Sequence, residues 1–205
     1  MILAIIAITV AVSIMAMYNK DVFYRLKFTP YLVLHSKQWY RFFTHAFIHA
    51  GWMHLLINMW VLYLFGHVVV DNYYGIFGVK GYYYFILLYL GAIMISSLPS
   101  YGKYKNNPYY NAVGASGATS AVLFASILFY PIGKIMIFPI PIGIPAFIFG
   151  LLYLIYSAYM SKRGGDNIGH DAHFWGAVFG VLFTIAIKPA VALYFIDQVR
   201  YFISF

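Results

Sequence analysis

The sequence contains no cysteine and no glutamate. Without cysteine the chain can form no disulfide, no thiolate nucleophile and no cysteine-based metal site. All five acidic residues are aspartates, at positions 21, 71, 166, 171 and 197. A zinc protease of the HExxH type is therefore excluded, because its general base is a glutamate. An intramembrane aspartyl protease is disfavoured, because Asp166 follows two glycines in a loop and no second aspartate falls in the middle of an apolar segment.

Charge is scarce as well. Charged residues make up 9% of the chain, hydrophobic residues make up 63%, and the mean hydropathy is +0.80. A soluble domain of 205 residues could not bury that much apolar surface. The composition predicts an integral membrane protein, and its 21 tyrosines suit the bilayer interfaces. The net charge of +8 indicates loops attracted to anionic lipid, and no basic cluster is dense enough to suggest nucleic acid.

Apolar segments long enough to cross the bilayer organise the chain into a multi-pass, all-α fold. We expect a single domain over residues 1–205, with no soluble accessory domain. The predicted spans are 2–18, 53–71, 82–98, 115–130, 144–160 and 170–187. Residues 1–17 lack the basic start of a cleaved signal, so we interpret them as the first span. The tail 189–205 is predicted to be an interfacial helix, with a short seventh span as the alternative.

Two connections suggest function. Residues 19–52 form the longest connection, polar and aromatic, and a loop of that length usually has a role. The fourth segment is short: from Ser116 to Tyr130 it would measure about 22 Å as a helix, against a hydrocarbon core of about 30 Å. The polar residues 104–113 must then descend to meet it. Irregular backbone at that depth needs protein or water around it, so we predict a wet cavity leading to Ser116.

Ser116 lies between Gly114 and Gly117 at the start of that segment. Glycines permit a tight turn and a close backbone approach, and the first amides of a helix have no intrahelical partner, so they can bind an oxyanion. These residues fit a serine nucleophile. The alternative is an N-cap serine beside glycines that serve helix packing.

His173 begins the sixth segment and shares one helix face with Gly176 and Gly180. The fourth segment offers a matching stripe of small residues at Gly117, Ala121 and Ala125. Small residues at this spacing let membrane helices approach closely. Two such stripes could bring His173 to Ser116 as its general base. The alternative is an interfacial histidine beside a plain packing motif.

A third group contains His54 and Asn58, which share a face of the second segment. Both side chains can donate hydrogen bonds to a developing oxyanion. Together with His45 and His49 they could instead bind a metal, although no aspartate lies near in the sequence. For His45 and His49 we favour structural hydrogen bonding. Asp171 points to a different helix face from His173, so a Ser–His dyad is expected and not a triad.

These motifs resemble those of the rhomboid intramembrane serine proteases, in order along nearly the whole chain. Residues 40–44 (YRFFT) and 47–59 (FIHAGWMHLLINM) are similar to the family's first-loop and second-helix signature. Gly114-Ala115-Ser116-Gly117 is similar to its GxSG motif. Ala172-His173, followed by Gly176 and Gly180, is similar to its AHxxGxxxG motif.

The resemblance implies a six-helix bundle with a long, membrane-associated first loop. It implies that Ser116 is the nucleophile and His173 the base, and that His54, Asn58 and the Ser116 amide form the oxyanion site. Arg41 would brace the first loop, and the fifth helix with the loop 161–169 would control substrate access. The expected substrates are transmembrane proteins of the cell membrane, and no metal, organic cofactor or oligomer is required.

Two features depart from this pattern. Many members carry, four residues after the nucleophile, an aromatic residue that packs on the catalytic histidine, and this chain has Ser120 there. This departure affects the packing of the histidine and not the expected chemistry. The second hypothesis is a non-proteolytic relative that binds membrane clients, although such relatives usually lack the serine or the histidine. The family's topology also places the first, third and fifth loops outside the cytoplasm. Here these loops carry most of the Lys and Arg residues, and the positive-inside rule favours the opposite orientation. We expect the family's orientation, because a first loop embedded in lipid would weaken the charge count.

Overall fold

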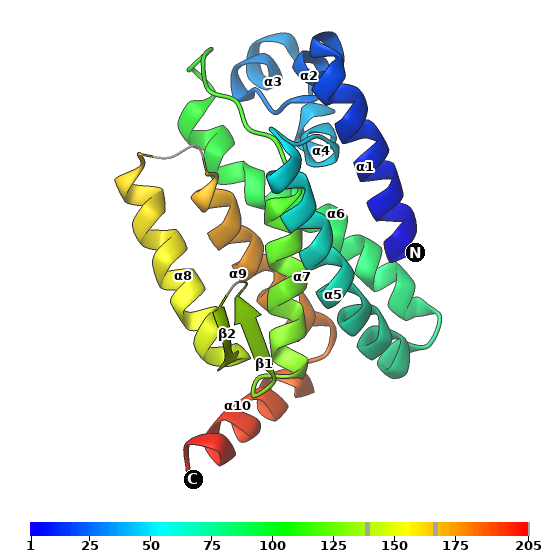
Figure 1. Ribbon diagram of the computed structural model, residues 1–205, viewed down its shortest axis with the longest axis vertical. Helices are drawn as coiled ribbons and strands as arrows, with labels where there is room; N and C mark the ends of the chain where they lie inside the picture. Colours follow the sequence, from blue (N-terminus) through cyan, green and yellow to red (C-terminus); the bar gives the residue numbers. More distant parts are fainter. Residues whose placement is uncertain (138–139, 166–167, 205) are drawn as a thin grey trace.

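The computed structural model describes residues 1–137, 140–165 and 168–204, and most of them are helical. Figure 1 shows a helical bundle with α7 at its centre. The helices are α1 (Ile2–Tyr18), α2 (Lys20–Leu26), α3 (Pro30–Ser36), α4 (Arg41–Thr44), the 3-10 turn η1 (His45–Phe47), α5 (Trp52–Phe77), α6 (Lys80–Tyr104), α7 (Ser116–Phe129), α8 (Ala146–Arg163), α9 (His170–Ile187) and α10 (Ala190–Ile203).

The central helix α7 is buried along its length. Every residue from Gly117 to Phe129 is buried, and α7 packs against α5, α6, α8 and α9. Small residues at Gly117, Ala118, Ala121 and Ala125 allow this close surrounding. The 14 residues of α7 would extend about 21 Å, so the shortness predicted for this helix is confirmed.

The outer surface of the bundle is apolar, as expected of a membrane protein. Among the described residues, α5, α6 and α9 are long and apolar enough to cross a membrane. The helices α1 and α7 are apolar but shorter. The chain is therefore a mostly helical membrane protein, and the count of six spans stays a prediction.

The helix boundaries follow the predicted segments best where the apolar pattern is uninterrupted. Helix α1 (Ile2–Tyr18) and helix α9 (His170–Ile187) match 2–18 and 170–187. Helix α5 runs beyond 71 to Phe77, and α6 starts at Lys80, so the predicted connection 72–81 shortens to a turn at Gly78, where φ is +61°. Polar and aromatic residues suit a helix end at the membrane surface as well as a loop, so polarity alone does not mark where α5 ends.

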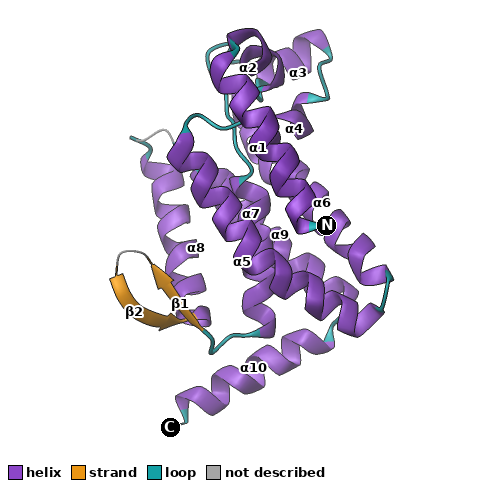
Figure 2. Ribbon diagram, turned by 45° about the vertical axis from the view of Figure 1, so that its right-hand side comes forward, coloured by secondary structure: helices purple, strands orange, loops and turns teal. Residues whose placement is uncertain are grey.

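Residues 131–143, which connect the fourth and fifth predicted spans, are not a loop throughout, and the fold is not purely helical. Strands β1 (Lys134–Ile137) and β2 (Ile140–Pro145) form an antiparallel hairpin, in which Lys134 pairs with Pro145 and Ile135 with Ile144. Prolines prevent a helix in this region, while β-branched isoleucines favour extended backbone. Figure 2 shows the hairpin beside the start of α8.

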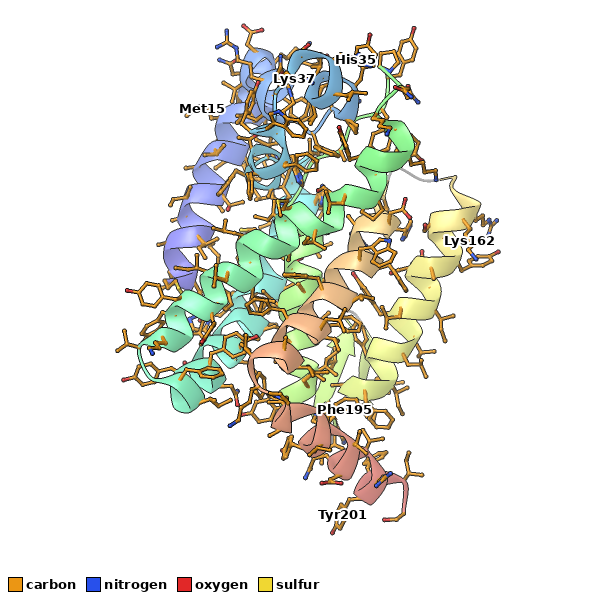
Figure 3. All side chains as sticks on the ribbon, turned by 180° about the vertical axis from the view of Figure 1, so that it is seen from behind. Met15, His35, Lys37, Lys162, Phe195 and Tyr201 are labelled. Atoms are coloured by element: carbon orange, nitrogen blue, oxygen red, sulfur yellow. The ribbon has the colours of Figure 1, made fainter. Side chains whose placement is uncertain are left out.

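The two ends of the bundle differ. The first loop folds into α2, α3, α4 and η1 at the end where α7 and α9 begin (Figure 1). At the opposite end α10 covers residues 190–203 of the tail that was expected to be interfacial. Figure 3 places Lys37 and Lys162 at the first end and Tyr201 at the other.

Candidate active site

The site forms where the first turns of α7 and α9 lie side by side. A Cβ atom on Gly176 would lie 3.0 Å from the Cα atom of Gly117 and would overlap its carbonyl oxygen. One turn further, a Cβ on Gly180 would collide with the backbone of Ala121 in the same way. Both steps are four residues in the same direction, so the two helices are parallel and in backbone contact. The predicted contact between the two small-residue stripes is confirmed at these two pairs.

This register places Ser116 and His173 within one helical turn of each other along the two helix axes. Ser116 immediately precedes Gly117, and His173 lies about one turn before Gly176. The carbonyl oxygen of Ala172 also approaches Gly117, 3.4 Å from where its Cβ would be. Both side chains are half-buried, so each can still be reached from a neighbouring space. The structure thus brings the two candidate residues to the same end of adjacent helices.

Ser116 is the first residue of α7, and the capping position belongs to Ala115. The interpretation of Ser116 as an N-cap is therefore wrong. Its amide lies in the first turn, where no intrahelical acceptor exists. Gly114 precedes it with φ at +110°, a conformation that favours glycine. The hydroxyl and the amide of Ser116 consequently lie together at the start of the central helix.

His54 reaches the same turn from α5. A Cβ atom on Gly114 would lie 2.6 Å from both Cε1 and Nε2 of the His54 ring. Only a glycine at position 114 leaves room for the imidazole there. The ring edge of His54 therefore faces the peptide segment that leads into Ser116, as an oxyanion donor would.

Asn58 lies one turn below His54 and is buried. Its Nδ2 donates to the His54 carbonyl oxygen at 2.8 Å. The hydroxyl of Thr119 donates to Asn58 Oδ1 at 3.0 Å, with the Ser116 carbonyl oxygen as a second acceptor at 3.2 Å. Because Oδ1 is held as an acceptor, the amide nitrogen is fixed as the donor. Thr119 was missed from the sequence, although it lies one turn after Ser116.

His49 connects three parts of the chain and is buried. The Ser13 hydroxyl donates to the Phe47 carbonyl oxygen at 2.9 Å, so His49 Nδ1 must donate to Ser13 Oγ, also at 2.9 Å. The His49 Nε2 then accepts the Ala115 N–H at 3.4 Å. Burial, with smaller contributions from the His54 and His45 imidazoles, lowers the pKa of His49 to about 3. A neutral His49 thus links α1, the first loop and the residue before Ser116.

His45 has an equivalent structural position. Its Nε2 lies 3.1 Å from Ser97 Oγ on α6, and its carbonyl oxygen accepts the Gly114 N–H at 2.9 Å. Burial is the main cause that lowers the pKa of His45 to about 4. The hydrogen bonds of His45 and His49 agree with the structural roles favoured for them. Within the described part of the chain, no group of three His or Asp side chains is arranged to hold a metal ion.

Arg41 holds the first loop together from inside. It is buried, and its Nη1 donates to the carbonyl oxygens of Tyr24 at 3.0 Å and Lys27 at 2.6 Å. Its Nε donates to Gln38 Oε1 at 2.6 Å. Burial lowers the pKa of this guanidinium from its usual value. These bonds are those of a side chain that braces the loop.

Asp171 belongs to a different contact from the site. The Ser161 hydroxyl near the end of α8 donates to Asp171 Oδ1 at the start of α9. Asp171 therefore ties α8 to α9, in agreement with its predicted absence from a triad. Two open pockets beside the first loop, of about 640 and 470 Å³, are lined by residues other than Ser116. The predicted wet cavity at Ser116 stays a prediction.

Comparison with known proteins identifies the class that this fold and site define. The profile of the Rhomboid domain family matches residues 36–190, three quarters of the chain. The chain belongs to the rhomboid family. It is 32% identical over 142 residues to the presenilin-associated rhomboid-like protein, mitochondrial, of Homo sapiens, covering 66% of this chain and 35% of that protein.

Two further relatives come from a plant and a yeast. The rhomboid-like protein 11, chloroplastic, of Arabidopsis thaliana is 28% identical over 182 residues, covering 82% of this chain and 60% of the relative. The rhomboid protein 1, mitochondrial, of Saccharomyces cerevisiae is 29% identical over 149 residues, covering 71% of this chain and 41% of the relative. The matched region is thus only about a third to three fifths of these relatives' length. Their names place them in mitochondria or chloroplasts, so they give no support to the predicted location in the cell membrane.

Proposed function

We propose that this chain is an intramembrane serine endopeptidase, which cleaves peptide bonds in or near the transmembrane segments of other membrane proteins. The observation that carries the proposal is the backbone contact of Gly117 with Gly176, which supports a close approach of Ser116 and His173 at the neighbouring first turns of α7 and α9. Family membership supports the same reading. The proposed topology has six spans, in which α1, α7 and α8 complete the set begun by α5, α6 and α9.

In the proposed mechanism His173 takes the proton of the Ser116 hydroxyl as Oγ attacks the substrate carbonyl. The negative charge that develops on the carbonyl oxygen is stabilised by donors from the Ser116 amide, the His54 ring and the Asn58 amide. His173 then gives its proton to the departing amine. In the second half, His173 takes a proton from the water that attacks the acyl-enzyme and passes it to Ser116 Oγ as the acyl–oxygen bond breaks. The carboxylic acid product leaves, and the Ser116 hydroxyl is restored.

Contacts within the fold support this role for each proposed donor. Thr119 fixes the orientation of Asn58, and Gly114 makes room for His54. The Ser116 amide is available because it opens α7. Preorganised donors of this kind contribute about 10²–10³-fold each to the rate of acyl transfer.

The test uses purified protein in liposomes with a fluorogenic transmembrane substrate. We expect cleavage by the wild type, and a loss of about a thousandfold or more in Ser116→Ala and in His173→Ala. A chelator should leave cleavage unchanged, whereas a histidine-based metal protein would lose its function and tolerate Ser116→Ala. Undiminished cleavage by Ser116→Ala would contradict the proposal. Binding of the substrate without cleavage by the wild type would favour the non-proteolytic, client-binding alternative.

A further inference from the structure

Position 120, one turn after Ser116 on α7, is a serine, so this position of α7 offers no aromatic ring to His173. In the structure an aromatic ring covers His173 all the same. The ring of Tyr153, from α8, is stacked on the His173 ring with centroids 6.2 Å apart and an angle of 25° between the planes. The contact comes from a different helix.

Ser120 holds this ring in place. Its hydroxyl lies 2.6 Å from the hydroxyl of Tyr153, and Ser120 itself is buried. Ser120 is one turn below Ser116 on α7. The small side chain therefore provides both the space that the tyrosine ring needs and the hydrogen-bond partner that its hydroxyl needs when buried.

Two phenylalanines complete the surroundings of Tyr153. The ring of Phe124 on α7 lies 5.5 Å from it, and that of Phe149 on α8 lies 6.0 Å from it, centroid to centroid. One turn before Tyr153, Gly150 lets α8 lean on α7, since a Cβ there would lie 3.2 Å from Ile127 Cδ1. Tyr153 is thus fixed on several sides, with its free face against His173.

We propose that Tyr153 is a positioning residue for His173, anchored by Ser120, and that α8 in this way contributes to the orientation of the catalytic base. The inference rests on the proposed function, because it concerns the base of that reaction. Figure 1 shows α8 at the edge of the bundle beside α9. A displacement of α8 away from α9 would carry the ring off His173, so the packing of the base depends on the position of an outer helix.

The effect of Tyr153 should fall on the chemical step and not on substrate binding. We expect Tyr153→Leu to lower kcat about tenfold and to leave KM within about twofold. A small fluorophosphonate, which reacts with Ser116 without a transmembrane segment, should label this variant about tenfold more slowly. Tyr153→Phe keeps the ring and loses only the hydroxyl, so its labelling rate should fall only about threefold. The control Tyr159→Leu, on the exposed face of the same helix, should label at the wild-type rate.

A reciprocal variant distinguishes a role in positioning His173 from a role in the stability of the fold alone. Ser120→Tyr combined with Tyr153→Ala returns an aromatic ring to His173 from α7. We expect it to label at least threefold faster than Tyr153→Ala alone, at a similar thermal midpoint. Wild-type labelling by Tyr153→Leu, or no recovery in the reciprocal variant, would overturn the inference. If the wild type neither labels nor cleaves, the proposed function itself fails, and that result is separate from the other two.

Discussion

The carbonyl group of Gly117 on α7 lies directly against the Cα position of Gly176 on α9, in a space that no side chain could share. Because this contact brings the first turns of α7 and α9 together, it also constrains how Ser116 lies relative to His173. A methyl group added at position 176 must move the two helices apart. Overpacking of this kind typically lowers stability by about 1–3 kcal/mol.

The first prediction concerns this contact. Gly176→Ala should lower the free energy of unfolding by about 1–3 kcal/mol, and kcat about a hundredfold, because a displacement of about 1 Å between reacting groups has that effect. Cleavage of the fluorogenic substrate and thermal unfolding in detergent measure the two quantities. Gly75→Ala is the matched control, since no atom lies within 4 Å of a Cβ there. It should leave kcat unchanged, and wild-type kcat in Gly176→Ala would contradict the prediction.

The small-residue spacing let the sequence predict this part of the site. Gly117 and Ala121 step by four residues, as do Gly176 and Gly180, and a shared period in two apolar segments is enough to predict a close approach. The same reasoning placed His54 and Asn58 on one face of α5. Local periodicity fixes which face of each helix can pack, and the motif residues lie on those faces.

Other parts of the site could not be predicted in this way. The stacking of Tyr153 on His173 depends on how α8 is rotated and how far it leans on α7, and no pattern within α8 sets either. Thr119 is one of several hydroxyls in α7, and its role follows only from the distance to Asn58. The hairpin of β1 and β2 was missed because prolines and glycines indicated a loop, while pairing between two short segments is a non-local property.

A second prediction concerns the hydrogen bond from Thr119 to Asn58. Asn58→Ala should lower kcat by about 10²–10³-fold, as expected for the loss of an oxyanion donor. Thr119→Val keeps the shape and removes the hydroxyl, and we expect it to lower kcat about tenfold by releasing the Asn58 amide. In the Asn58→Ala background the same change should have little further effect, because the two residues act together.

Thr184→Val is the control for this cycle. Thr184 is also buried, and its hydroxyl lies 2.7 Å from that of Tyr73, far along α9 from His173. Its loss should lower thermal stability and leave the kcat of the folded protein unchanged. Additive effects of Asn58→Ala and Thr119→Val would show that Thr119 does not act through Asn58.

A third prediction concerns pH. Burial lowers the pKa of His49 to about 3 and that of His45 to about 4, from a usual value of 6.5 that applies in the unfolded chain. Between pH 6.5 and about 4 the unfolded chain binds protons that the folded chain does not. The stability contributed by these neutral histidines is therefore complete above pH 6.5 and is lost progressively as the pH falls.

Thermal midpoints in detergent between pH 4.5 and 7.5 test this expectation. The wild type should lose stability on acidification, and His49→Gln, which cannot take up a proton at this position, should be less stable at pH 7.5 and have a flatter profile. His35→Gln serves as the control, because His35 is exposed at the surface of the first loop. A wild-type profile that rises on acidification would show that His49 and His45 are charged in the folded protein.

The last prediction concerns orientation, for which the loop charges and the family topology disagree. Residues 19–51 and α10 lie at opposite ends of the structure (Figure 3), so one label at each end determines the orientation.

Because the natural chain has no cysteine, a single introduced cysteine is a unique site for labelling. We choose Ser36→Cys at the end of α3 and Ser204→Cys after α10, both at exposed positions. If the first loop lies outside the cytoplasm of a bacterial host, a membrane-impermeant maleimide should label position 36 in intact cells and position 204 only after lysis. The reverse pattern would mean that the excess of Lys and Arg in the first, third and fifth loops determines the orientation, as the positive-inside rule requires.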